Sequence, residues 1–183
     1  MMKTDINGPR IKLRIPTLRD TESIARNIND KEIARWTIAI PYPYKREDAI
    51  EFIKANRERY RKKKSYGFSI ADKTTNEVIG GVGLHKLDIE DAKAELGYWL
   101  ARRKWGRGIA AEAVYLISKF AFNKLKLHRV YACTFKENFA SQRVLEKCGF
   151  TLEGVLRDAM RKRGRYHDEM LYGLLKSELV KPY

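Results

Sequence analysis

Hydrophobic and polar residues alternate in several short segments of the chain, which is the pattern of a strand with one buried face. The clearest case is residues 11–15, IKLRI, which end at Pro16. A second alternation starts at Tyr66, and KTTN at residues 73–76 predicts the turn of a hairpin. We expect strands over residues 11–15, 66–70, 78–84, 94–100, 130–135, 151–156 and 170–175.

Other segments place apolar residues three or four positions apart, as in a helix with one buried face. Thr17, followed three residues later by Asp20, is typical of a helix start. We expect helices starting at Thr17 and over residues 47–64, 106–124 and 138–148. Gly149 then suits a left-handed cap. Residues 36–44, WTIAIPYPY, are apolar but interrupted by two prolines, which predicts a loop with exposed aromatic side chains.

The resulting order, β-α-α-β-β-β-α-β-α-β-β, predicts a mixed α/β (α+β) fold. The chain has 183 residues, and no internal repeat or linker divides it. This length suits one domain and is short for two. We therefore expect a single domain over residues 1–183.

Composition excludes several protein classes. With 44% hydrophobic and 33% charged residues, the chain is neither collagen-like nor disordered. No apolar run approaches the ~18 residues of a membrane helix, and residues 1–5 hold no apolar segment of a secretory signal. The two cysteines, Cys133 and Cys148, indicate a reducing compartment rather than a disulfide framework. We expect a cytoplasmic globular protein that does not bind membranes.

The net charge of +15, with a pI near 9.8, predicts attraction to anions. Phosphate groups, an acidic protein and, more weakly, nucleic acid are all compatible partners. A solvated surface rich in Lys and Glu, as in heat-adapted proteins, would give the same balance without any partner. The charge alone does not decide between them.

Residues 100–112, LARRKWGRGIAAE, have the features of a phosphate site. A strand ends, cations follow, and Gly106 and Gly108 open a helix, whose first N–H groups have no partner within the helix. Glycine lets the backbone approach a ligand closely. Arg103 and Lys104 add positive charge. A pyrophosphate is the occupant that these features predict.

Two phosphate-binding patterns fit this segment. The dinucleotide pattern G-x-G-x-x-[GA] also requires an acidic residue about 20 positions later to hold a ribose. The chain has Lys126, His128 and Arg129 there, and the segment lies past mid-chain instead of opening the fold. The second pattern, R-x-x-G-x-G, is met by Arg103, Gly106 and Gly108 and carries no such requirement.

Residues 138–150, NFASQRVLEKCGF, resemble the N-x-x-S/A…E-K-x-G-F segment of the GNAT superfamily of N-acetyltransferases. Residues 94–100, AELGYWL, resemble the strand that precedes its acetyl-CoA loop. Together they are similar to the Rim-type branch (RimJ/RimL-like), whose namesakes acetylate the N-termini of ribosomal proteins. The resemblance is strongest over residues 78–150 and weaker towards the C-terminus.

This resemblance implies a twisted, mostly antiparallel sheet with splayed middle strands, flanked by helices, and acetyl-CoA in the cleft. It implies that backbone groups of Tyr98–Leu100 pair with the pantetheine arm, that amides from Trp105 to Ala110 hold the pyrophosphate, and that Asn138 hydrogen-bonds the pantetheine region. The cofactor-binding residues expected are Tyr98, Trp99, Leu100, Arg103, Lys104, Trp105, Gly106, Arg107, Gly108, Ile109, Ala110 and Asn138. No metal is expected, because the three histidines lie far apart and without zinc-ligand spacing.

Direct transfer to an amine requires a base, because an ammonium ion has no lone pair. Glu95 is the favoured base, since a carboxylate within a sheet is rarely buried without a purpose. The alternative is that Glu95 is exposed and forms an ion pair with a neighbouring lysine. Some Rim-type relatives carry a Glu base at the position that we match to Met160, with Asp158 close by. Asp168 and Glu169 are less favoured candidates for the general base.

The departing thiolate benefits from a proton donor. Many GNAT enzymes use a tyrosine at the position that Leu145 occupies here. Ser141 lies one helical turn after Asn138 on the same face, which makes it the better candidate. The alternative is that Ser141 has no catalytic role and is only a small residue that suits the first turn of the helix.

The resemblance and the basic balance favour the α-amine of a protein N-terminus, acidic or ribosomal, as the acceptor. The basic residues between the last two strands, at 157–165, suit an acidic polypeptide. A small amine or polyamine is the alternative acceptor, although a chain of charge +15 repels polycations. A ribosome- or RNA-binding module without catalysis is the alternative of another class, and a monomer and a homodimer both remain open.

Overall fold

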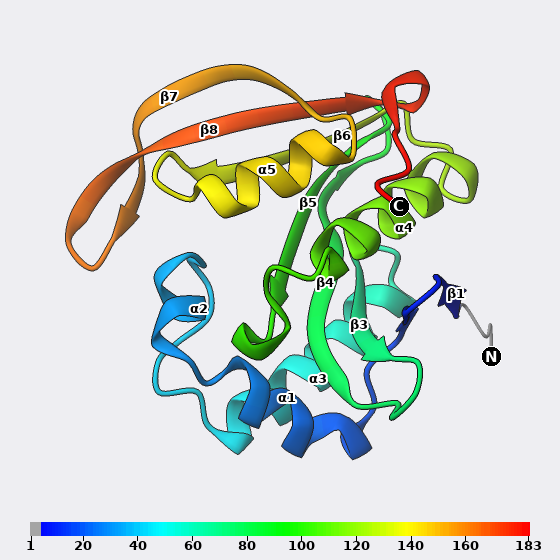
Figure 1. The fold of residues 1–183 in the computed structure, drawn as a ribbon, viewed down its shortest axis with the longest axis vertical. Coiled ribbons are helices and arrows are strands. Elements are labelled where there is room, and N and C mark those ends of the chain that lie inside the picture. Colours follow the sequence, from blue (N-terminus) through cyan, green and yellow to red (C-terminus); the bar gives the residue numbers. More distant parts are fainter. Residues whose placement is uncertain (1–4) are drawn as a thin grey trace.

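The centre of the protein is one twisted eight-stranded sheet. The computed structural model describes residues 5–183 (Figure 1), so the expectation drawn from the N-terminal residues falls almost wholly outside it. The strand order is β1-β2-β3-β4-β5-β6-β8-β7. The strands are β1 (Ile6–Asn7), β2 (Ile11–Arg14), β3 (Tyr66–Asp72), β4 (Val78–Asp88), β5 (Lys93–Leu100), β6 (Arg129–Phe135), β7 (Thr151–Lys162) and β8 (Arg165–Leu175).

The sheet divides between β5 and β6, the one neighbouring pair that is parallel. These strands are in register only where Lys93–Glu95 lies beside Arg129–Tyr131. Beyond that point β5 continues along β4 as far as Leu100, while β6 continues along β8 as far as Phe135. The strands thus form the two arms of a V with its apex at Glu95. The expected mostly antiparallel sheet with splayed middle strands is confirmed.

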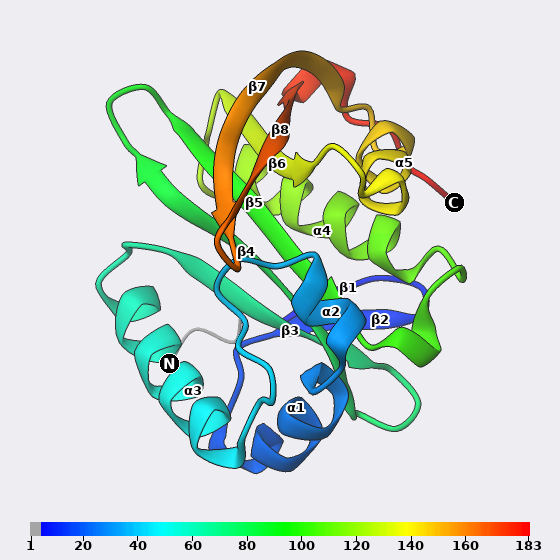
Figure 2. The same ribbon diagram turned by 90° about the vertical axis from the view of Figure 1, so that its left-hand side faces the viewer.

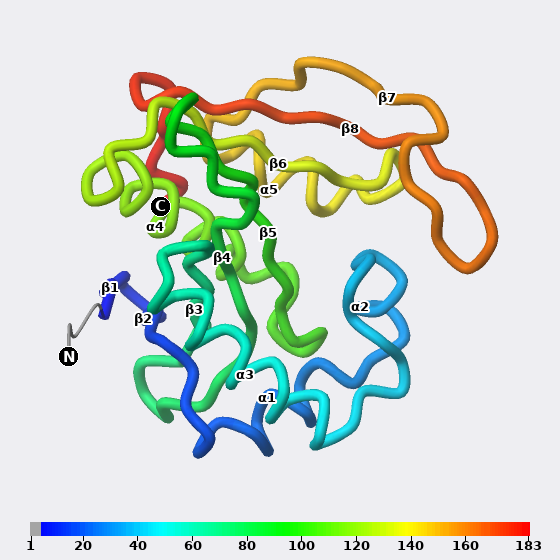
Figure 3. Tube along the Cα trace, turned by 180° about the vertical axis from the view of Figure 1, so that it is seen from behind, coloured from blue at the N-terminus to red at the C-terminus, as the bar shows by residue number. Residues whose placement is uncertain are grey.

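Helices cover both faces of this sheet (Figures 2 and 3). They are α1 (Thr21–Ile28), α2 (Lys31–Arg35), α3 (Arg46–Arg61), α4 (Ile109–Asn123) and α5 (Phe139–Lys147), with 3-10 turns η1 (Leu18–Asp20), η2 (Arg102–Lys104) and η3 (Lys176–Glu178). The larger apolar cluster joins the sheet to α4 and α5, and includes Val114, Ile117 and Leu145. A smaller cluster lies under α1, α2 and α3. In residues 5–183, no helix is long and apolar enough to cross a membrane.

The segment 36–44 differs from the exposed loop that the prolines predicted. Trp36 directly follows α2, a five-residue helix that the sequence pattern did not reveal, and its ring packs edge-on against Phe135 at 6.1 Å. Tyr44 is buried in the smaller cluster, whereas Tyr42 is exposed as expected. A helix this short has no periodicity of its own to detect, and contacts distant in sequence stabilise it.

The C-terminal hairpin is longer than its predicted strands. Residues 161–169, RKRGRYHDE, expected as a basic turn, lie mostly within β7 and β8, and only Arg163 and Gly164 form the turn. Both have positive φ, 47° and 79°, as the tight turn of a twisted hairpin requires. The ladder is interrupted between Leu156 and Met160, which bends the hairpin near its end.

Candidate active site

Past the apex of the V, β5 has no sheet partner on the side facing β6. Residues 96–100 pair with β4 alone, so the other edge of the strand is open for hydrogen bonding, apart from the Leu100 carbonyl. That carbonyl accepts a bond of 2.7 Å from the Trp105 indole. An extended ligand can therefore pair with this edge as an additional strand. The residues Tyr98–Leu100, predicted to hold the pantetheine arm, lie along it.

A nest of backbone amides follows at the start of α4. Gly106 and Gly108 both have φ of +72°, and Gly108 is the residue before the helix. This left-handed backbone delays the helix to Ile109, three residues later than predicted. In the described part of the chain, the N–H groups of residues 106–111 donate to no protein acceptor. With the helix dipole they form a site for an anion such as pyrophosphate.

The amide nest is held in place by residues that lie about a hundred positions earlier in the sequence. The Arg10 guanidinium donates to the Arg107 carbonyl at 2.5 Å and to the Glu112 carboxylate at 2.8 Å. Glu112 is fully buried in the first turn of α4, and it also accepts the backbone N–H groups of Arg10 and Ile11. These contacts fix the start of α4 to the start of β2. No local pattern in the sequence indicates these contacts.

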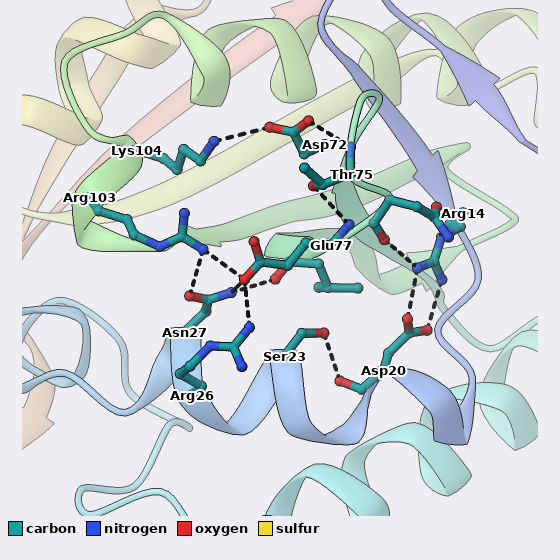
Figure 4. Close-up of polar contacts among 12 residues, drawn as sticks. Arg14, Asp20, Ser23, Arg26, Asn27, Asp72, Thr75, Glu77, Arg103 and Lys104 are labelled. Atoms are coloured by element: carbon teal, nitrogen blue, oxygen red, sulfur yellow. Dashed lines mark hydrogen bonds and ion pairs between the residues drawn. The ribbon is translucent and has the colours of Figure 1, made fainter.

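Arg103 and Lys104, predicted to add charge to the phosphate site, both contact carboxylates (Figure 4). Arg103 donates to Glu77 at 2.7 Å and to the Asn27 side chain at 3.2 Å, while Lys104 pairs with Asp72 at 3.0 Å. Their charge is thus partly neutralised. The contacts fasten η2 to α1 and to the β3–β4 turn, so both residues position the loop that carries the amide nest.

Glu77 lies at the centre of this network. Arg26, Asn27 and Arg103 all donate to it. These donors, led by Arg26, lower the pKa of the Glu77 carboxyl from its usual 4.5 to about 2. The carboxylate is therefore ionised throughout the physiological range, and it holds three groups from two separate segments in place.

Asn138 and Ser141 meet at the start of α5. The Asn138 side chain caps the helix by accepting the Ser141 N–H at 3.2 Å. Its Nδ2 donates to no acceptor within residues 5–183, so it is free to bind a ligand. The Ser141 hydroxyl lies 2.8 Å from the Tyr98 hydroxyl on β5, which links the helix to the β5 arm of the V.

The Tyr98 side chain also belongs to the site, although no sequence motif points to it. Only its backbone was expected to act, because the motif says nothing about its hydroxyl. Burial raises the pKa of this phenol well above its usual value, so the hydroxyl stays protonated. Paired with Ser141, it forms a short hydrogen-bonded chain beside the open edge of β5.

Glu95 lies at the apex of the V on the opposite face of the sheet from Tyr98. It pairs in register with Tyr131 across the parallel junction and with His85 across β4. Lys86 forms an ion pair with it at 2.7 Å, and about a fifth of the Glu95 side chain is exposed. Since β5 alternates its side chains, Glu95 and the Ser141–Tyr98 pair face opposite sides of the same gap.

Neither cysteine is a thiolate at neutral pH. Burial, followed by the contact with the Glu169 carboxylate, raises the pKa of the Cys133 thiol far above its usual value. Burial raises the pKa of Cys148 to about 12. Protonated thiols of this kind suit packing roles for both side chains. Within the described residues, no group of three or more His, Cys, Asp or Glu side chains is arranged to hold a metal ion.

Known proteins are similar to this chain in sequence and in fold. Residues 10–151 match the family model described as the acetyltransferase (GNAT) domain. The chain is 34% identical over 169 residues to the uncharacterized N-acetyltransferase p20 of Bacillus licheniformis, covering 92% of this chain and 94% of that protein. It is 32% identical over 170 residues to the putative ribosomal N-acetyltransferase YdaF of Bacillus subtilis, covering 92% of each.

Among solved structures, Mycobacterium smegmatis RimJ in complex with CoA-disulfide superimposes with a TM-score of 0.85 at 25% identity. The match covers 93% of this chain and 84% of that one. The fold similarity therefore extends over nearly the whole chain.

Proposed function

Because the chain belongs to the GNAT family of acetyltransferases, in its Rim-type branch, and is an acetyl-CoA-dependent N-acetyltransferase, we propose that it acetylates the α-amine of a protein N-terminus. Ribosomal proteins are the acceptor class that we propose. One relative is named a putative ribosomal N-acetyltransferase, and the chain carries a net charge of +15 that attracts acidic polypeptides.

The observation that carries the proposal is the placement of two proton-transfer groups on opposite sides of one gap in the sheet. Glu95 faces one side at the apex of the V, and Ser141 with Tyr98 faces the other. An amine can thus approach from the Glu95 face while a thioester lies along the edge of β5. Direct transfer between two substrates needs such a two-sided passage, because each must reach the same carbon atom.

The residues present fit acetyl-CoA on structural grounds. The unpartnered amides of residues 106–111 form a cradle for its pyrophosphate, and the open edge of β5 can pair with the amides of its pantetheine arm. Asn138 has a free Nδ2 for the same arm. When bound, acetyl-CoA supplies an activated acetyl thioester.

Proton transfer follows from the same geometry. Glu95 accepts the proton of the incoming ammonium group, directly or through one water molecule, and so frees the lone pair that attacks. Backbone N–H groups on the open edge of β5 donate to the carbonyl oxygen as it gains charge. The Ser141 hydroxyl donates a proton to the departing sulfur, and the neutral Tyr98 hydroxyl orients it. As the C–S bond breaks, the nitrogen loses its second proton to water, and Ser141 recovers its proton from water.

Peptide acetylation tests this proposal. The protein is incubated with acetyl-CoA and two peptides with free α-amines, one with acidic and one with basic residues after the first position. Mass spectrometry then locates the acetyl group. We expect α-amine acetylation with the acidic peptide preferred, and a preference that shrinks as salt screens the charges. Acetylation of a polyamine with neither peptide modified would instead identify a small-amine enzyme.

The base is tested with Glu95→Gln, and exposed Glu90 provides a matched control in Glu90→Gln. Loss of a general base should lower kcat by about 10²–10⁴-fold, with the KM for acetyl-CoA nearly unchanged. The control should behave as the wild type. Equal activity of both variants would remove Glu95 from the mechanism.

An acceptor of this kind, and the two unpaired thiols, also favour a cytoplasmic location.

A further inference from the structure

A bulge in β4 turns the Lys86 side chain towards the Glu95 face of the sheet. His85 pairs in register with Glu95, but the next pair along the ladder joins Asp88 to Lys93, so two residues of β4 stand opposite one of β5. An extra residue of this kind redirects side chains and is frequent beside active sites. Lys86 has a φ of +44°, a left-handed backbone that a lysine rarely adopts. In a regular strand its side chain would point to the opposite face from His85.

The Lys86 ammonium group lies beside the base, where the amine of an acceptor is needed. It is 2.7 Å from the Glu95 carboxylate, and about three quarters of the Lys86 side chain is exposed. Its charge also acts on β6: burial raises the pKa values of Tyr131 and Cys133, and the Lys86 charge opposes both shifts. A general base must be within hydrogen-bond reach of the proton that it takes. Lys86 meets this requirement without any bound acceptor.

Lys86 is a slower acceptor than a peptide α-amine. The hydrogen bond and the charge of Glu95 raise the pKa of Lys86 above its usual value, so its amine is protonated at neutral pH. An α-amine has a pKa of about 7.7–8.0 and is uncharged far more often. We therefore expect Lys86 to react mainly while no acceptor occupies the site.

We propose that Lys86 is a self-acetylation site, to which the protein transfers the acetyl group of its own bound acetyl-CoA. The inference rests on the proposed function, because Glu95 serves as the base in both reactions. Glu95 takes one proton from Lys86 Nζ, and the freed lone pair attacks the thioester carbon. An N–C bond forms and the C–S bond breaks. Of the two protons that the nitrogen loses, one ends on the sulfur of coenzyme A and the other in water. The amide product is uncharged, so the ion pair with Glu95 is lost.

Isotope-labelled acetyl-CoA and mass spectrometry test the proposal, with Lys126 as an internal control. Lys126 is an exposed lysine that also has a positive φ, 59°, but no carboxylate within residues 5–183 forms an ion pair with it. Acetic anhydride first gives the chemical reactivity of each lysine. After this correction, Lys86 should gain label from acetyl-CoA at least about 100-fold faster than Lys126, because only Lys86 has a base beside it. Equal corrected rates would overturn the proposal.

Dilution separates transfer within one molecule from transfer between molecules. At saturating acetyl-CoA, the labelling rate of Lys86 per molecule of wild type should stay constant as the protein is diluted about 100-fold, since donor and acceptor belong to the same molecule. A rate that falls in proportion to the protein concentration would overturn self-transfer. This measurement uses the wild type alone, so it does not depend on the stability of any variant.

Substitution tests the part that Glu95 plays. Glu95→Gln should slow the labelling of Lys86 about 100-fold, and the control Glu90→Gln should leave it unchanged. If the carboxylate merely paired with Lys86, its loss would lower the pKa of the amine and speed up the labelling, because Glu95 is what raises that pKa. An unchanged or faster rate in Glu95→Gln would therefore overturn the proposal.

Failure of the proposed function gives a different result. Acetylation of the acidic peptide at its α-amine, without label on Lys86, would overturn self-acetylation and leave the proposed function intact. Label on Lys86 that is independent of dilution, with no peptide α-amine acetylated, would support self-acetylation and show that the N-terminal acceptor is wrong. Absence of label from Lys86 overturns the inference whatever the peptides show.

Discussion

Replacing Glu112 with glutamine should destabilise the protein by about 2 kcal/mol. Glu112 is fully buried and accepts three hydrogen bonds, from the backbone N–H groups of Arg10 and Ile11 at 2.9 and 3.2 Å and from Arg10 Nε at 2.8 Å. Glutamine has the same shape, so its oxygen can keep the two backbone bonds. Its amide nitrogen, however, faces the Arg10 guanidinium as donor against donor.

The magnitude follows from the bond that is lost. A hydrogen bond between charged groups contributes about 1.5–3 kcal/mol, more than a neutral one. The upper end is not reached here, because the Arg10 side chain is about half exposed and water can solvate it when its partner is gone. For a chain of this length, about 2 kcal/mol lowers the melting temperature by roughly 4–8 °C.

Thermal unfolding of the purified variant at neutral pH is the assay, with Glu146→Gln as the control. Glu146 is exposed and accepts one bond from the Tyr172 hydroxyl, which a glutamine oxygen can also accept, so its substitution should change stability by no more than about 0.5 kcal/mol. The KM for acetyl-CoA should rise in Glu112→Gln only, because Arg10 also holds the Arg107 carbonyl beside the amide nest. Equal melting temperatures for the wild type and Glu112→Gln would refute this account.

Four further outcomes are expected. Ser141→Ala should lower kcat about 10–100-fold with little change in the KM for acetyl-CoA, and an unchanged kcat would exclude Ser141 as the proton donor. Tyr98→Phe should lower kcat only about three- to tenfold, since the serine hydroxyl remains; a larger loss than in Ser141→Ala would reverse the order of the two. Gly108→Ala should cost about 1 kcal/mol of stability, because the φ of +72° at this position is unfavourable for alanine. The same substitution should raise the KM for acetyl-CoA. If calorimetry shows that the variant binds acetyl-CoA with wild-type affinity, the role of the amide nest is contradicted. The pKa of Glu77 is lowered to about 2, so its carboxylate stabilises the fold above the usual pKa of 4.5 and loses that contribution as the pH falls towards 2. The difference in unfolding free energy between the wild type and Glu77→Gln should therefore shrink over this pH range. A constant difference would refute the stabilising role of the Glu77 network.

Local patterns in the sequence identified the parts of the site that lie close together along the chain. The strand 94–100 and the glycines at 106 and 108 depend on neighbours within a few residues, and the structure places them as expected. Thr17 starts the 3-10 turn η1, and the predicted helix itself begins later, at Thr21. The resemblance carried by residues 138–150 correctly indicated the family. These features are encoded locally, since turn chemistry, capping and side-chain alternation act over one or two turns of chain.

Some expectations failed or stayed incomplete because the deciding contacts are distant in sequence. Tyr44 is buried rather than exposed, since the cluster beneath α1 and α3 covers it. Arg103 and Lys104 meet carboxylates that no motif connects to them. The hydroxyl of Tyr98 gains its role only when α5 brings Ser141 to within 2.8 Å.

The sequence by itself determined the alternation of β5, and therefore that Glu95 and Tyr98 face opposite sides of the sheet. It also determined an amide nest at the start of α4, because glycine and helix geometry are local. Only the tertiary structure decided that β5 and β6 part at Glu95, that Arg10 and Glu112 support the nest, and that Lys86 contacts Glu95. The reason is physical: strand pairing and charge pairing across a hundred residues depend on which surfaces the folded core brings together, and no local pattern records that choice.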